Sequence, residues 1–96
     1  MGEKTNNMQD ENELFKKAID AYGIEPQFNM VFEECGELIN ALAKFIRGRN
    51  DKSEVITELA DVSIMIGQMV YLFGYDDFIK ERDAKLERLK ERLKEH

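Results

Sequence analysis

Residues Glu33 to Asp61 read EECGELINALAKFIRGRNDKSEVITELAD, and the rest of the chain is organised around them. Each end carries two acids three residues apart, Glu34 with Glu37 and Glu58 with Asp61. If both ends are helical, each pair lies on one face of its helix. The polar break RGRNDKS lets the second helix return alongside the first. The sequence therefore predicts four carboxylates that converge between two antiparallel helices.

Clustered carboxylates repel one another and raise one another's pKa, so such a group requires a cation. Oxygen ligands without a nearby histidine or cysteine pair favour Mg²⁺, with Mn²⁺ as a substitute, over zinc. The alternative is a set of separate surface salt bridges to Lys44, Arg47 and Lys52. Asp61 favours the metal, because its neighbours are mostly apolar and an unpaired carboxylate in a core is costly.

Composition excludes several classes of protein. A chain of 96 residues is one domain, and a net charge of -6 argues against nucleic acid as a partner. Cys35 is the only cysteine, and the only histidine, His96, is the last residue, so neither a disulfide nor a Ser-His nucleophile is expected. No apolar run approaches a membrane span, and the polar N-terminus does not resemble a signal peptide. A cytoplasmic protein without membrane partners is predicted.

The spacing of apolar residues predicts an all-α chain, with residues 1–9 disordered and residues 10–96 forming a single domain. Glycine and proline mark the boundaries of four helices. The first predicted helix covers 10–22 and is ended by Gly23, and the second covers about 26–47 with Pro26 in its first turn. The third is capped by Asn50, Asp51 or Ser53 and runs to about Phe73, where Gly74 ends it. The fourth runs from a cap at Asp76 or Asp77 to the C-terminus.

The third predicted helix is apolar around nearly its whole circumference from Val62 to Phe73. Four helices of this length cannot bury that surface. The sequence therefore predicts a protomer like a four-helix bundle, assembled into a homodimer or tetramer through this helix. Gly36, inside the second predicted helix, indicates either a close approach by a neighbouring helix or a ligand, or simple close packing, whereas Gly67 predicts a helix–helix crossing.

The pair EECGEL and ELADV resembles the EExxE…ExxD signature of the MazG-like all-α nucleoside triphosphate pyrophosphohydrolases, relatives of the dimeric all-α dUTPases. The resemblance extends over about residues 25–90. It implies that Glu34, Glu37, Glu58 and Asp61 are Mg²⁺ ligands. It also implies hydrolysis of a nucleoside or deoxynucleoside triphosphate to the monophosphate and pyrophosphate.

The same resemblance implies substrate contacts. The family segment N-x-K-F-x-R corresponds here to DAKLER, so Lys85 and Arg88 are expected to bind phosphates, although Asp83 replaces the usual asparagine. Gln27 and Asn29 resemble positions that face the nucleotide in some relatives. Thr57 replaces a frequent glutamate, which leaves one acid fewer for an additional metal ion.

Either Glu33 or one of the ligand carboxylates, with Glu37 the candidate among them, is expected to orient the attacking water. A second hypothesis, of a different class, is a helical oligomerisation or regulatory module. Its acids would bind a metal or a basic partner without catalysis.

Overall fold

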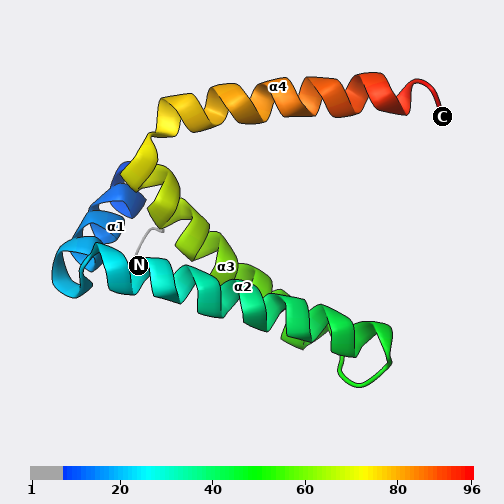
Figure 1. Ribbon diagram of the computed structural model, residues 1–96, viewed down its shortest axis with the longest axis horizontal. Coiled ribbons are helices and arrows are strands. Elements are labelled where there is room, and N and C mark those ends of the chain that lie inside the picture. Colours follow the sequence, from blue (N-terminus) through cyan, green and yellow to red (C-terminus); the bar gives the residue numbers. More distant parts are fainter. Residues whose placement is uncertain (1–7) are drawn as a thin grey trace, which may run out of the picture.

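The computed structural model describes residues 8–96, and the regular structure of that range is entirely helical (Figure 1). The prediction of an all-α chain with four helices is confirmed. Residues 1–7 of the predicted disordered terminus lie outside the described range, and the first helix begins before the predicted boundary at residue 9. The helices are α1 (Met8–Tyr22), α2 (Ile24–Ile46), α3 (Lys52–Phe73) and α4 (Tyr75–Leu93).

Glycines end two of these helices as the sequence predicts. Gly23 has φ 97° and donates its N–H to the Ile19 carbonyl, and Gly74 has φ 131° and donates to the Val70 carbonyl. Residues with a side chain rarely adopt a positive backbone φ, so both turns favour glycine. Each turn lets the next helix begin at once in a new direction.

The predicted N-cap of α3 is confirmed, whereas the predicted N-cap of α4 is not. Asp51 caps α3, because its side chain accepts a 3.1 Å hydrogen bond from the Ser53 backbone N–H. The predicted cap of α4 at Asp76 or Asp77 is wrong: Gly74 occupies the cap position and makes no side-chain hydrogen bond. Both aspartates lie in the first turn instead, where their charge favours the positive end of the helix dipole.

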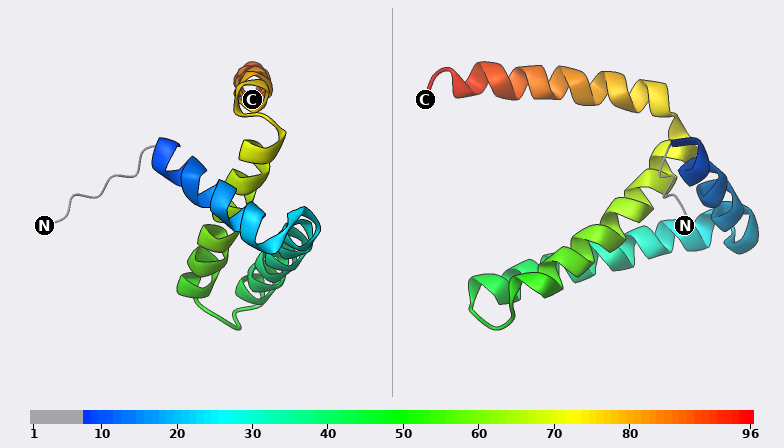
Figure 2. Two further views of the ribbon diagram at one scale, coloured as in Figure 1. Left: turned by 90° about the vertical axis from the view of Figure 1, so that its left-hand side faces the viewer. Right: turned by 180° about the vertical axis from the view of Figure 1, so that it is seen from behind.

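The antiparallel pair α2 and α3 forms the body of the chain, and the two helices are joined by a short loop (Figure 2). Ala41 and Met65 are buried. Asn50 ties the loop to α2, because its Nδ2 donates to the Ala41 carbonyl at 3.2 Å. This loop sets the register in which the acids of α2 meet those of α3.

Helix α1 lies across α2 and α3 at the end opposite that loop (Figure 2). A Cβ at Gly67 would lie 2.8 Å from the Phe15 ring, so the predicted close approach at Gly67 is a crossing of α1 over α3. The stacked rings of Phe28 and Phe73, 6.1 Å apart, join α2 to α3 at the same end. A Cβ at Gly36 would meet nothing within 4 Å, so the close approach predicted there is not made within the described chain.

Helix α4 leaves this body (Figure 1). It contacts only α3, and none of its residues is buried. The radius of gyration is 16.5 Å, against about 12.5 Å for a compact domain of this length. Within this chain, α4 therefore does not lie along the other three helices.

By length and composition α3 is able to cross a membrane, although the sequence predicted no such segment. Only 11% of its apolar window is buried within the chain, and the core helix of a soluble assembly meets the same criterion. Glu58 and Asp61 lie inside this helix, and an acid at the centre of a bilayer costs roughly 2.5 to 3.5 kcal/mol. These carboxylates favour packing of α3 against protein.

Candidate functional site

Three glutamates from α2 and α3 meet in the middle of the antiparallel pair. Glu34 and Glu37 lie one turn apart on α2, and Glu58 lies on α3. One carboxylate oxygen of each lies within 4.8 Å of the other two. Glu34 and Glu58 are half-buried, whereas Glu37 is exposed. The convergence predicted from the spacing is therefore present for these three acids.

Two oxygens of this group are buried without a partner. Oε1 of Glu34 and Oε1 of Glu58 accept no hydrogen bond from any described residue. Buried polar atoms are nearly always paired, and an unpaired carboxylate oxygen is among the most costly exceptions. These atoms therefore need a partner from outside the described chain, which a proton, a water molecule or a cation can supply.

The electrostatics of the two half-buried acids agree with their positions. Burial raises the pKa of Glu34, and the neighbouring carboxylates of Glu37 and Asp61 raise it further. Burial likewise raises the pKa of Glu58, again with contributions from Glu37 and Asp61. Both acids are thus harder to ionise than a free glutamate, and a bound cation would reverse that effect.

Asp61 differs from the expectation that it enters the core. Its side chain is exposed, and it is not among the three acids whose oxygens converge. It still lies close enough that its charge raises the pKa of both Glu34 and Glu58. Asp61 therefore lies at the edge of the group. The half-buried members are Glu58, one turn earlier on α3, and Glu34 on α2.

The alternative of surface salt bridges is not realised at this site. Within residues 8–96, neither Lys44, Arg47 nor Lys52 forms an ion pair with any of the acids. Ion pairs occur elsewhere, between neighbouring residues of one helix. They join Lys16 to Asp20 at 2.7 Å, Lys90 to Glu87 at 3.6 Å and Lys94 to Glu91 at 3.3 Å.

The candidate catalytic residue Glu33 is exposed beside the group, and its charge contributes to the raised pKa of Glu34. It lines a surface pocket of about 610 Å³ between the start of α2 and the middle of α3. The other residues lining this pocket are Tyr22, Pro26, Gln27, Asn29, Met30 and Met65. Both residues that resemble nucleotide-facing positions, Gln27 and Asn29, therefore line it.

Gln27 is only 5% exposed, and its amide Nε2 donates a 2.7 Å hydrogen bond to Oε1 of Gln68 on α3. Gln68 is itself 6% exposed and was not identified from the sequence. A signal existed, because Gln68 lies three residues after the buried Met65 and so on the same helix face. This buried amide pair holds the inner wall of the pocket.

The predicted phosphate ligands are not brought to this site within the chain. Lys85 and Arg88 are exposed on α4, and α4 does not contact α2. Of the predicted site residues, the structure therefore assembles those on α2 and α3 and leaves those on α4 apart.

Chemically, the group is a set of oxygen donors that fits a hard divalent cation. The donors are carboxylates, two of them hold an unpaired buried oxygen, and within residues 8–96 none of them forms an ion pair. Comparisons of this chain with protein-family models, with curated proteins and with solved structures found no match.

Proposed function

We propose that this protein is a Mg²⁺-dependent pyrophosphohydrolase that converts nucleoside or deoxynucleoside triphosphates to the monophosphate and pyrophosphate. The observation that carries the proposal is the convergence of Glu34, Glu37 and Glu58, with buried unpaired oxygens on two of them. The resemblance of the two acidic motifs to the MazG-like signature supports this chemistry over simple metal storage.

Glu34, Glu37 and Glu58 would hold the metal, with Asp61 at the edge of the group. When bound, Mg²⁺ neutralises the triphosphate and polarises the phosphorus under attack, with Mn²⁺ as a substitute. Glu33 and Glu37 are exposed, so a water molecule and substrate have access to both. One of these two carboxylates would orient that water and accept its proton.

The proposed assembly is a homodimer, or a tetramer built from two dimers. The accessible surface is 7734 Å², against about 5,700 Å² for a compact monomer of 11.2 kDa. Exposed apolar side chains on two helices contribute to this surface. Ile64 and Phe73 are 53% and 71% exposed on α3, the helix predicted to form the interface. Phe32, Ile39 and Ile46 are 69%, 68% and 83% exposed on the flank of α2 opposite Glu37. A second copy would cover this flank and would also supply a path by which Lys85 and Arg88 reach an acidic group.

Sedimentation tests this assembly. Wild-type protein should sediment as a dimer or larger species at micromolar concentration. Ile39→Glu should shift it toward monomer, because a charge on the apolar flank resists burial. Lys17→Glu, an exposed change on α1, is the control and should leave the assembly unchanged. A compact, stable wild-type monomer would contradict the proposal.

Activity is tested with a panel of ribonucleoside and deoxyribonucleoside triphosphates in the presence of Mg²⁺. Pyrophosphate and the monophosphate should form in equal amounts from at least one of them, and chelation of the metal should stop the reaction. Demonstrated metal binding without pyrophosphate release from any nucleotide would refute the enzyme.

The extensive apolar surface also suits the second candidate, a non-catalytic helical oligomerisation or regulatory module. Glu37→Gln and Asp61→Asn distinguish the two functions. For a module, stability should rise or stay level, with no activity to lose. For an enzyme, turnover should collapse while the fold persists.

A further inference from the structure

The cations that bind the triphosphate need to lie beside the acids, and in this chain α4 does not place Lys85 or Arg88 there. A small cavity of about 90 Å³ extends from the acidic group toward the α2–α3 loop. Among the residues that the structure describes, Lys44 is the one cationic residue that lines this cavity. The other residues lining it are Glu37, Asn40, Ala41, Glu54 and Glu58.

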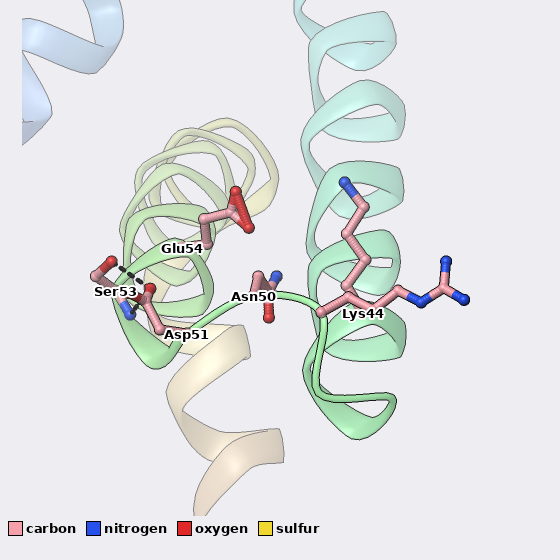
Figure 3. A pocket seen from close by; sticks show the side chains of 6 residues that line it. Lys44, Asn50, Asp51, Ser53 and Glu54 are labelled. Carbon is pink, nitrogen blue, oxygen red and sulfur yellow. Dashed lines mark hydrogen bonds between the residues drawn. The ribbon is translucent and has the colours of Figure 1, made fainter.

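Lys44 is well placed relative to the acids. It follows Glu37 by seven residues, which puts the two on nearly the same face of α2, about 10 Å apart along the helix axis. Figure 3 shows its side chain directed back along α2, away from the loop. Glu37 precedes Lys44 on α2 and therefore lies in that direction. Lys44 forms no ion pair within residues 8–96, so its amine is available to a ligand.

A second, larger pocket of about 620 Å³ continues from Lys44 over the loop (Figure 3). Arg49 lines it and adds another positive charge. Of its two acids, Asp51 is already occupied, because it accepts hydrogen bonds from the Ser53 backbone N–H and from Ser53 Oγ at 2.6 Å. Glu54 is the remaining acid, and it lines both cavities.

On the other side of the acids the surroundings are different. The pocket of about 610 Å³ is walled by Tyr22, Pro26, Met30 and Met65, with the Gln27 amide at its inner wall. Apolar walls with a few amides suit a base and sugar, whereas a lysine and an arginine suit phosphates. The acidic group lies between these two environments.

We propose that Lys44, with Arg49 beyond it, binds the β- and γ-phosphates of the nucleotide. The substrate then lies along the α2–α3 groove with its phosphates toward the loop and its nucleoside toward Gln27. This assignment rests on the proposed function and adds to it the direction of the substrate and a phosphate contact on α2.

Lys44→Met is the test, and Lys52→Met is its matched control, because Lys52 is an exposed lysine near the same loop that lines none of these pockets. The Lys44 variant should raise KM for the triphosphate at least about 10-fold, the effect of losing a charge-assisted hydrogen bond. It should weaken inhibition by pyrophosphate by a similar factor and leave inhibition by the nucleoside monophosphate within about twofold. Lys44→Arg should restore most of the affinity.

Thermal melts of all three variants identify any loss of fold, and calorimetric titration with Mg²⁺-pyrophosphate measures the phosphate contact without turnover. Equal behaviour of Lys44→Met and Lys52→Met would overturn the phosphate position and leave the proposed function standing. Equal weakening of pyrophosphate and monophosphate inhibition would overturn the direction of the substrate. A wild-type protein that hydrolyses no nucleotide would overturn the function itself.

Discussion

Carboxylates on α4 and carboxylates between α2 and α3 occur at similar helix spacings but in different surroundings. On α4, Glu87 and Glu91 have exposed side chains and pair with lysines three residues away. Between α2 and α3, Glu34 and Glu58 are half-buried and each keeps an unpaired oxygen. An exposed pair contributes at most about 1 kcal/mol and needs no ligand. Burial without a partner, rather than the density of charge, therefore distinguishes the candidate site.

The largest expected difference between the two regions is in turnover. Glu37→Gln removes a charged donor from the convergent group and should lower kcat/KM at least about 100-fold. That exceeds the roughly 10- to 100-fold loss that follows removal of a group that only orients a metal ligand. Glu87→Gln on α4 removes the same chemical group and should leave kcat/KM within about twofold. Equal losses of kcat/KM in the two variants would contradict the assignment of the site to the group between α2 and α3.

Metal binding should stabilise the folded state through the α2–α3 group alone. At a Mg²⁺ concentration of about 100 times Kd, the stabilisation is about 2.7 kcal/mol, which raises Tm by about 13 °C for a domain of this length. The measurement is a thermal melt at constant protein concentration, against NaCl of equal ionic strength. The rise should vanish in Glu58→Gln and persist in Glu91→Gln. Identical melts in both salts would favour screening of surface charge.

The stability of the metal-free protein should depend on pH through Glu34. The pKa of Glu34 is raised in the folded state, so the folded protein binds this proton more tightly than the unfolded chain does. The resulting stabilisation is complete below the unfolded pKa and is lost as pH rises through the folded pKa. In metal-free protein, the Tm of Glu34→Gln should therefore exceed that of wild type by a margin that grows as the pH rises from about 4 until it passes the folded pKa of Glu34.

Mg²⁺ should remove this margin, because the cation favours the ionised glutamate that the variant lacks. The check is a series of melts of both proteins across that pH range, with chelator and then with metal. A margin that does not change with pH would mean that Glu34 is not a proton-binding member of the group.

The smallest effect is expected on α4. Lys90→Gln breaks the 3.6 Å pair with Glu87, whose side chains are 66% and 68% exposed. The free energy of unfolding should change by less than about 0.5 kcal/mol, and Tm by no more than a few degrees. Urea titration gives the value directly. A larger loss would show that α4 is packed against a second copy through this face.

The local structure of this protein follows from its amino-acid sequence alone. Apolar spacing located the four helices, Gly23 ended α1, and Asp51 and Gly74 marked the two ends of α3, because these features depend on backbone geometry within a few residues. The spacing of Glu34 and Glu37 was likewise enough to place them on one face of α2.

Which side chains are buried and which are paired depends on the packing of the helices and could not be predicted from the sequence. Helical periodicity describes one helix and does not say what lies opposite each face. The exposure of Asp61, the buried hydrogen bond between Gln27 and Gln68, and the place of Lys44 beside the acids all depend on how α3 packs against α2. The departure of α4 from the body similarly depends on the turn at Gly74, whose φ of 131° sets the direction of the last helix.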